Sequence, residues 1–473
     1  MSIARSSIGW FTANVISSVV AFFALIYFSR ELGPKVLGVY FLFNSILNVL
    51  KLFGNVGLQA ATTKRISEGV DASEFFTASL IIRLVPFLIL SIGVFLARSF
   101  LNSFMGAELS IFLIILLGFL QFSDLMRETL QGEKKVATSA FVDLAQVIGK
   151  VSVQVVLVVL GAGIYGLIVG LNVGFMVSIA FGIFLIDVRL CRPRREHYLS
   201  ILDFSRYSFG NAIGGYLYEW ADIVVIGLFL TQEFVGVYGV CWIISGVFLL
   251  SSQAVASSIF PRISELSGRG ELDEIRGIFS EGLVFSSFLV IPAMVGTLIL
   301  SSDLLGIVYG EDFRVGYLVL IILMLGRVFQ SFQMISVRVM EGMDRPDVVF
   351  RINIVTTVLN IVGTLVLVYW IGFEGAAVAT SLTIGVSFLW NTYYVLTFLD
   401  ARLPYREFSF ELVSAGLMGI FVWLLWNAAL FSPVFNLVLS IITGAMLYFL
   451  VILGISRNMR LKIFTLLSIA GKV

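Results

Sequence analysis

A series of long apolar stretches constrains the fold of this chain more than any other feature. A helix needs about 20 apolar residues to cross the hydrocarbon core of a bilayer, and such stretches follow one another with only short polar segments between them. The sequence therefore predicts an all-α polytopic membrane protein with about fourteen transmembrane helices. The predicted spans are 8–29, 36–60, 75–97, 109–130, 136–160, 164–187, 205–230, 234–260, 278–300, 315–340, 348–371, 375–398, 409–430 and 434–455.

The composition favours a membrane protein and excludes several classes of function. Hydrophobic residues make up 59% of the 473 residues and charged residues 13%, whereas an ordinary soluble domain has about 25% charged residues. The net charge of +1 gives no reason to expect a nucleic-acid partner, and one His and two Cys are too few for a zinc site or a disulfide framework. Because the sequence has no P-loop and no HExxH motif, we expect neither an enzyme, nor a cofactor, nor direct use of ATP.

Basic residues are distributed unevenly between the two sides of the predicted membrane. If the N-terminus lies in the cytoplasm, 23 of the 31 Lys and Arg residues fall on the cytoplasmic side and 4 on the outer side, as the positive-inside rule requires. Both termini are therefore expected in the cytoplasm, with the chain in the cell membrane. The basic segment 189–197 is expected to be a solvated inner loop, and it contains the single histidine, His197.

Short sequence matches recur at equivalent places in two halves of the chain. Arg-Ile-Ser-Glu occurs at 65–68 and again 197 residues later, at 262–265. The other matches pair 38–40 with 236–238 (Gly-Val-Tyr), 130–135 with 340–345, and 164–170 with 373–379. They predict two parallel six-helix repeats, because an even number of helices lets both halves enter the membrane from the same side. The predicted lobes are 1–190 and 191–400, and residues 401–473 add two helices and a cytoplasmic tail.

Polar residues inside the predicted spans lie on single helical faces. The span 36–60 carries Asn44, Asn48, Lys51, Asn55 and Gln59 at intervals of three or four residues, which is one face of a helix. Interhelical hydrogen bonds explain a single uncharged member of such a face, whereas a hydrated cavity between the two halves explains a whole face. The other faces are Gln121, Asp124, Glu128 and Gln131; Asp143, Gln146, Lys150 and Gln154; Asn211, Tyr218 and Asp222; Arg327, Gln330 and Gln333; and Asn353, Thr357, Asn360 and Thr364.

Basic residues inside the spans are candidate ligands for an anionic substrate. A charge in the hydrocarbon usually faces protein or water, so either a buried ion pair or a cavity-lining anion site explains them. An ion pair of Lys150 with Asp143 or Asp124 is an example of the first alternative. The predicted substrate-binding set is Lys51, Arg83, Lys150, Arg327, Asn48 and Asn55, with Lys51 and Arg327 expected to face each other across the cavity.

Carboxylates inside the spans are candidates for coupling transport to an ion gradient. Asp222, with Glu219 and Asp124, is the predicted site for H⁺ or Na⁺, because intramembrane carboxylates are where such ions bind. A salt bridge to an Arg or Lys of the cavity is the alternative interpretation of Asp222.

Two segments of the chain resemble a known family. Residues 28–46, FSRELGPKVLGVYFLFNSI, and residues 222–242, DIVVIGLFLTQEFVGVYGVCW, are similar to paired motifs of the polysaccharide-synthesis branch of the MOP superfamily, the Wzx-type flippases of lipid-linked oligosaccharides. The second copy lacks the Leu-Gly that follows the first helix, and has Leu230-Thr231 instead. The matching positions are Arg30, Leu32, Gly33, Gly38 and Tyr40, then Asp222, Ile226, Gly227, Leu230, Gly236 and Tyr238.

The resemblance implies a V-shaped, two-lobed transporter that works by alternating access around a cationic cavity. The implied substrate is a polyprenyl-(pyro)phosphate-linked oligosaccharide, which moves from the inner to the outer leaflet for surface glycan assembly. Membrane lipids and a glycan polymerase or glycosyltransferases are the implied partners. A lipid II flippase or a MATE-like multidrug exporter is the alternative within the superfamily. A membrane glycosyltransferase or polymerase is a further alternative, but it requires a large outer loop with catalytic acids, and the outer loops here are short.

Overall fold

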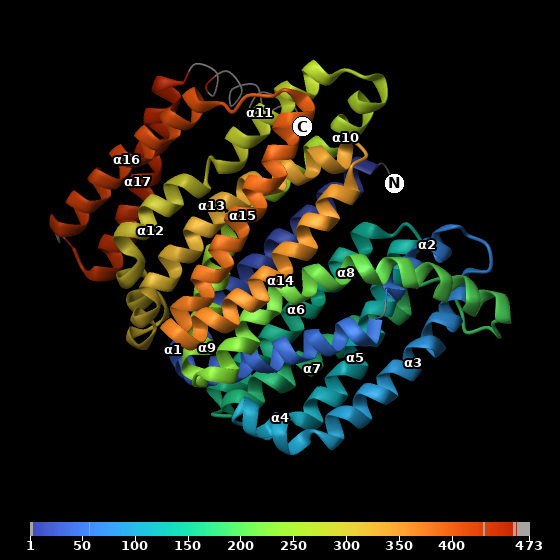
Figure 1. Cartoon of the computed structure of the whole chain (residues 1–473). Helices are drawn as coiled ribbons and strands as arrows, with labels where there is room; N and C mark the ends of the chain where they lie inside the picture. The colour runs from blue at the N-terminus through green and yellow to red at the C-terminus, as the bar shows by residue number, and fades with distance from the viewer. Residues whose placement is uncertain (1–2, 56, 429–430, 457–459, 461–473) are drawn as a thin grey trace. The chain divides into compact units, whose positions relative to one another are not determined.

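The structure, a computed structural model, is helical throughout the part of the chain that it describes (Figure 1). That part comprises residues 3–55, 57–428, 431–456 and 460, with side chains described except at 3–8, 10, 11 and 207–219. The helices are α1 (Ile3–Asn55), α2 (Leu58–Ser67), α3 (Ala72–Leu96), α4 (Arg98–Met105), α5 (Ser110–Gly132), α6 (Val136–Val159), α7 (Gly163–Leu185), α8 (Arg195–Phe229), α9 (Gln232–Val247), α10 (Leu249–Arg269), α11 (Leu272–Ser287), α12 (Val290–Leu304), α13 (Tyr317–Gly342), α14 (Pro346–Ile371), α15 (Phe373–Leu399), α16 (Tyr405–Ala428) and α17 (Pro433–Ile455). A π-helix, η1 (Leu305–Tyr309), and a 3₁₀-helix, η2 (Glu311–Gly316), connect α12 to α13.

The chain divides into two compact units, residues 1–236 and 237–473. The division falls later than the predicted lobe boundary after residue 190, because α8 packs against α1, α2 and α3 in the first unit. In the second unit α16 and α17 pack against each other and against α12. The predicted three-part division of the chain stays a prediction.

Many helices in the described residues are long and apolar enough to cross a membrane. Eleven meet this criterion, or up to twelve if the bent pair α9 and α10 forms one span. The predicted span 8–29 and most of 36–60 lie within the single helix α1, and residues 58–60 begin α2. Nearly all of the predicted span 205–230 lies in α8, where the side chains of 207–219 are outside the description. The chain is therefore a multi-pass membrane protein, and the count of fourteen stays a prediction.

The long helix α1 contains a break where the sequence has Gly33 followed by Pro34. Gly33 has φ 73° and ψ 176°, a conformation that glycine adopts readily and other residues rarely. Proline at the next position suits the first turn of a new helical segment, because its missing N–H has no partner there in any case. The break separates the two predicted spans of α1 without a loop.

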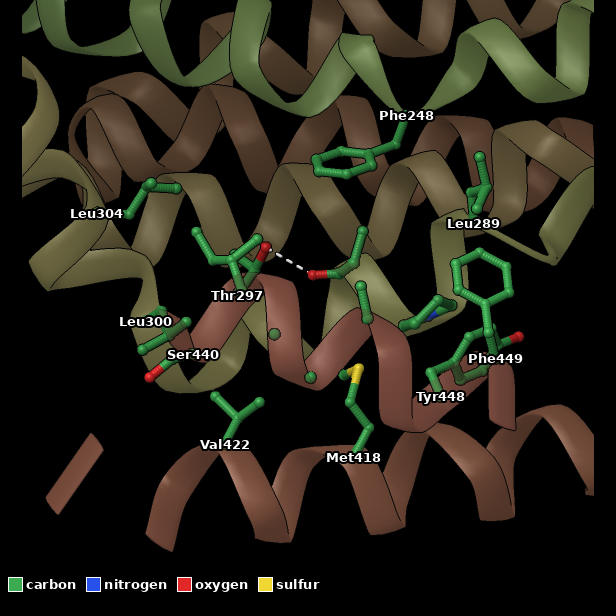
Figure 2. Close-up of a pocket in the computed structure, with 16 residues that line it drawn as sticks. Phe248, Leu289, Thr297, Leu300, Leu304, Met418, Val422, Ser440, Tyr448 and Phe449 are labelled. Carbon is green, nitrogen blue, oxygen red and sulfur yellow. Dashed lines mark hydrogen bonds between the residues drawn. The ribbon is translucent and has the colours of Figure 1, made fainter. Parts of the chain in front are cut away.

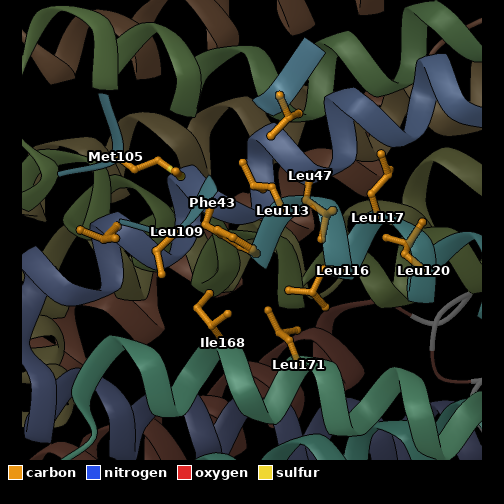
Figure 3. Packing of buried hydrophobic residues seen from close by; sticks show 12 residues of the cluster. Phe43, Leu47, Met105, Leu109, Leu113, Leu116, Leu117, Leu120, Ile168 and Leu171 are labelled. Atoms are coloured by element: carbon orange, nitrogen blue, oxygen red, sulfur yellow. The ribbon is translucent and has the colours of Figure 1, made fainter. Parts of the chain in front are cut away.

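A buried apolar cluster holds the first unit together around α5 (Figure 3). Phe43 and Leu47 of α1, Leu113 and Leu117 of α5, and Ile168 of α7 belong to it. Lipid tails are as apolar as leucine, so close packing rather than removal from water stabilises such a cluster in a bilayer. The cluster fixes α1 against α5 and α7, and this positions the polar faces of these helices.

The two Arg-Ile-Ser-Glu segments make the same packing contact. Ile66 at the end of α2 lies against Gly132, and Ile263 in α10 lies against Gly342. A Cβ atom added to either glycine would lie 2.7 Å from the isoleucine side chain. The matched segments therefore share a contact as well as a sequence, whereas the parallel arrangement of two six-helix repeats stays a prediction.

The glycines of the two Gly-Val-Tyr segments contact each other reciprocally. A Cβ atom on Gly38 would collide with the backbone oxygen of Gln232, and a Cβ atom on Gly236 would collide with the backbone oxygen of Pro34. Each of these oxygens belongs to the residue four positions before the opposite glycine. The start of α9 can approach α1 this closely only because both positions lack a side chain.

The predicted solvated loop environment of His197 is wrong, because the ring is buried at the start of α8, whereas the predicted inner side of the membrane stays a prediction. Its Nε2 atom lies 3.2 Å from Oδ2 of Asp71, and its Nδ1 atom accepts a hydrogen bond from the backbone N–H of Arg194. The ring also packs edge-on against Phe75. His197 therefore ties the start of α8 to the turn before α3.

The repeated glycine contact predicts the effect of adding a methyl group. Gly342→Ala should destabilise the protein by about 1–3 kcal/mol, because the new Cβ overpacks against Ile263. Gly277→Ala is the matched control in α11, where open space surrounds the added atom. Alanine in a helix is about 1 kcal/mol more favourable than glycine, so this control should melt at the same or a higher temperature. Equal melting temperatures for both detergent-solubilised variants would show that the close contact is absent.

Candidate functional site

An ion-pair network lies among the membrane-spanning helices of the first unit. Nζ of Lys51 (α1) lies 2.8 Å from Oδ2 of Asp124 (α5), and Arg127 reaches the other carboxylate oxygen of Asp124 at 2.5 Å. Arg83 (α3) pairs with Glu128 (α5) and also donates to the backbone oxygen of Gln121 at 3.3 Å. Three helices thus supply charges to one place, in agreement with the cost of leaving a charge unpaired in hydrocarbon.

The network has an accessible edge and a closed edge. The side chains of Lys51 and Asp124 are 13% and 9% exposed, and that of Arg127 is 28% exposed. Arg83 and Glu128, by contrast, are 4% and 0% exposed. A ligand that enters between the helices would therefore meet Lys51, Asp124 and Arg127 first.

The spacing of charges along α5 explains how this helix joins the two edges. Asp124, Arg127 and Glu128 are three and four residues apart, so their side chains project from neighbouring positions on one face. Gly54 near the end of α1 leaves room for Gln121, whose amide nitrogen would lie 2.7 Å from a Cβ at that position. The small residue lets α1 approach α5, and this brings Lys51 within ion-pair distance of Asp124.

The network contains as many acidic as basic groups. Asp143 on α6 lies within electrostatic range of Arg127, Asp124 and Lys51. With Arg83 and Glu128, three basic side chains balance three carboxylates. A negatively charged ligand must therefore replace one of these carboxylates as the partner of a basic group.

The other predicted binding residues of the first unit have separate positions. Lys150 is half-buried on α6 and makes no ion pair within the described residues, so the pairs considered with Asp143 and Asp124 are not formed. Asn48 donates to the backbone oxygen of Asn44 at 2.8 Å, and Asn55 accepts from the backbone N–H of Gln59 at 3.0 Å. Both asparagines thus bond locally along the chain.

Arg327 lies in a different environment, in the second unit. Its guanidinium carbon lies 4.0 Å from the centre of the Trp242 ring, a cation–π contact. It donates to Oγ of Ser245 at 3.2 Å and to Oε1 of Gln330 at 2.7 Å. The side chain is buried and held in one orientation by an aromatic face and neutral oxygen atoms.

The three predicted coupling residues do not share one environment. Asp222 is buried on α8, whereas the side chain of Glu219 lies outside the described residues. Asp124 is paired with two basic groups. Asp124 therefore has the geometry of a salt bridge, not that of an unpaired carboxylate available to a coupling ion.

Sequence reasoning misses three charged residues that the structure pairs or buries. Arg127 is one of the 23 basic residues that the sequence assigns to the cytoplasmic side, although its spacing of three from Asp124 indicates a shared face. Glu128 lay on a predicted polar face without an assigned partner. Glu411 was not considered, although it is a carboxylate inside the predicted span 409–430, and the structure buries it completely.

Comparisons with known proteins agree with this architecture. A probable low-salt glycan biosynthesis flippase of Haloferax volcanii, Agl15, is 34% identical over 421 residues, which cover 89% of each chain. A probable flippase of the same organism, AglR, is 28% identical over 98% of each chain.

Solved structures with low sequence identity share the fold. The lipid II flippase MurJ in an inward closed conformation superposes with a TM-score of 0.79 and 17% identity, covering 96% of this chain and 99% of that one. An inward-facing multidrug resistance MATE transporter of the MOP superfamily superposes with a TM-score of 0.67 and 17% identity, covering 83% of this chain and 99% of that one. Residues 27–317 match the family described as polysaccharide biosynthesis protein. With these matches and its bundle of spanning helices, the chain belongs to that family and has the fold of the MOP superfamily.

Proposed function

We propose that the chain is a flippase that moves a polyprenyl-(pyro)phosphate-linked oligosaccharide from the inner to the outer leaflet by alternating access. The relationship to two proteins named as flippases, one of them for glycan biosynthesis, supports this class of function. The observation that carries it is the ion-pair network among spanning helices, which has the basic side chains of Lys51 and Arg127 at its accessible edge. A basic site within the membrane suits a lipid whose head group is a phosphate.

Head-group binding follows from an exchange of partners at Asp124. A phosphate oxygen can take the place of the Asp124 carboxylate against Lys51 and Arg127, because both anions accept the same charge-assisted hydrogen bonds. Arg offers two parallel donors to a phosphate, whereas Lys acts as a point charge. The exchange keeps Lys51 and Arg127 paired with an anion, while the displaced Asp124 carboxylate must turn to water or take up a proton, and Arg83 with Glu128 supports the helices from the closed edge.

The second unit supplies a separate anion contact in this proposal. Arg327 is oriented by Trp242, Ser245 and Gln330, so less conformational entropy is lost when it binds a ligand. Lys150, which has no ionic partner within the described residues, is a further candidate.

The alternatives differ in the charge of the substrate. A lipid II flippase would handle a related pyrophosphate lipid, and the basic network does not distinguish it. A multidrug exporter for cationic compounds is disfavoured, because Lys51 and Arg327 would repel such substrates. Coupling to H⁺ or Na⁺ through Asp222, and supply or use of the substrate by glycosyltransferases or a glycan polymerase, remain proposals.

Loss of the gene provides the test of the cellular role. Cells without this chain should lose surface glycan and accumulate the lipid-linked precursor in the inner leaflet, because synthesis continues while export stops. The precursor is quantified by mass spectrometry, and its leaflet is assigned with a membrane-impermeant glycosidase. An unchanged precursor distribution contradicts the flippase assignment.

Substitution of the accessible basic residues tests head-group recognition. Lys51→Gln and Arg327→Gln should each slow flipping in proteoliposomes by about 10- to 100-fold, because a hydrogen bond to a charged group contributes about 1.5–3 kcal/mol. Both variants should reach the membrane in normal amounts. Lys134→Gln, at an exposed position in the turn before α6, is the control and should flip at the wild-type rate. Wild-type rates for Lys51→Gln and Arg327→Gln would place the anion site elsewhere.

The closed edge of the network should respond differently. Arg83→Gln leaves Glu128 buried without its basic partner, and breaking a buried pair in this way costs about 3–5 kcal/mol. A lower melting temperature and a smaller amount of membrane-inserted protein are therefore expected. If Arg83→Gln is as stable as the wild type but inactive, Arg83 binds substrate directly.

The exposed Cys191 tests the proposed orientation. It lies between α7 and α8, whereas Cys241 is buried. A membrane-impermeant maleimide should label wild-type chains only after the cells are permeabilised, because the segment is proposed to be cytoplasmic. Asp312→Cys in a Cys191→Ser background should be labelled on intact cells. Labelling of Cys191 on intact cells would reverse the proposed orientation.

A further inference from the structure

A completely buried carboxyl group lies in the C-terminal helices of the second unit. Glu411 of α16 is 0% exposed. Its Oε2 atom accepts a hydrogen bond of 2.8 Å from Oγ of Ser287, the last residue of α11, and its Oε1 atom has no hydrogen-bond partner. Asp124 and Glu128 in the first unit each have a basic partner. Glu411 makes no ion pair within the described part of the chain, so its negative charge is not balanced locally.

The Ser287 hydroxyl can form a hydrogen bond with this carboxyl group in both of its protonation states. Its Oγ atom lies 3.1 Å from the backbone oxygens of Leu283 and Val284 as well as 2.8 Å from Glu411. When Glu411 is ionised, the hydroxyl proton points to the carboxylate. When Glu411 is protonated, the carboxyl O–H donates to Oγ, and the serine proton turns to a backbone oxygen. A change of protonation therefore needs only the rotation of one hydroxyl group.

A cavity of about 250 Å³ lies between α12, α16 and α17 of the same unit (Figure 2). Tyr448 of α17 lines this cavity, and its hydroxyl has no hydrogen-bond partner, although it lies within electrostatic range of Glu411. The hydroxyl of Ser440 in the same lining is also without a partner. Thr297, by contrast, donates to the backbone oxygen of Ala293 at 2.8 Å. Two buried hydroxyl groups without hydrogen-bond partners thus belong to residues that line an otherwise apolar cavity.

The charged groups on the surrounding helices have other partners or other positions. Arg276 of α11 pairs with Asp273, and Asp303 of α12 pairs with Arg314. Arg406 of α16 lies over the ring of Phe410. The remaining titratable groups on these helices are Glu274 and Glu281 of α11, Tyr405 and Glu407 of α16, and Tyr448 of α17. Of these groups, Tyr448 lies within electrostatic range of Glu411.

We propose that Glu411, with Ser287 and Tyr448, forms a proton-binding site in the C-terminal helices that is distinct from Asp222. Uptake of a proton from water forms one O–H bond on the carboxylate, and release breaks the same bond, with no other bond changed. A proton fits better than a metal cation, because hard cations take about six or more oxygen ligands and this site offers far fewer. The inference goes beyond the proposed flippase activity, since it concerns a group that need not touch the substrate.

Carbodiimide labelling of the wild-type protein tests the site without any transport assay. Dicyclohexylcarbodiimide is apolar and enters such cavities. The proton of a carboxylic acid moves to its nitrogen, the carboxylate oxygen bonds to its central carbon, and rearrangement gives a stable N-acylurea. Peptide mapping by mass spectrometry should find Glu411 labelled at pH 7, with labelling lost as the pH is raised. Absence of label at every pH overturns the proposal. Protection by Na⁺ at constant pH also overturns it, in favour of a metal cation.

Variants show whether the labelling depends on Glu411 itself or on a general change in the protein. Glu411→Gln should lose the label at this peptide and keep its melting temperature, since Gln resembles the protonated acid. Glu407→Gln, one turn earlier on α16, should keep the label on Glu411. Ser287→Ala should shift the pH at which labelling is lost. If Glu411→Gln fails to fold, the labelling of the wild type still decides the question. Labelling of Glu411 in a protein that flips no lipid would contradict the proposed function and leave the proton site standing.

Discussion

The arrangement of this protein depends on the cost of a charge in hydrocarbon. In the first unit the cost is met by pairing, so that Lys51 and Arg83 each find a carboxylate on α5. The pairs determine which faces of α1, α3 and α5 turn toward one another, and the apolar cluster around Leu113 and Leu117 fills the space beside them. In the proposed function the same pairs also bind the substrate, because a basic group that pairs with a carboxylate can pair with a phosphate instead. Stability and the proposed recognition then use the same side chains.

Much of this design can be predicted from sequence periodicity. The apolar lengths indicate a polytopic membrane protein, and intervals of three and four residues indicate that Asp124 and Glu128 share one face of a helix. The identity of their partners cannot be predicted in this way, because it depends on which helices are neighbours. Lys150 shows the difference. It lies on a polar face as predicted, but Asp124 pairs with Lys51 from α1 instead.

The position of a charge near the end of a span is a weak guide to its environment. Glu411 is the third residue of the predicted span 409–430, where water would ordinarily be close. It is buried where α11 ends against it at Ser287, and Tyr448 of α17 lies within electrostatic range. His197 is a second example. Its basic neighbours in the sequence predict a solvent-exposed ring, but the ring lies against Asp71 and Phe75. Both environments come from helices distant in sequence.

The reciprocal contact between Gly38 and Gly236 has the form of an isologous interface. Each glycine meets the backbone oxygen four residues before the other, at Pro34 and Gln232, as when identical surfaces meet across a two-fold axis. In a homodimer of half-length chains, one substitution at this position would alter both sides of the contact at once. In a single chain the two sides are encoded separately, so each can vary alone. The two segments do differ, since Leu-Gly-Pro stands at 32–34 before Gly38 and Leu-Thr-Gln stands at 230–232 before Gly236.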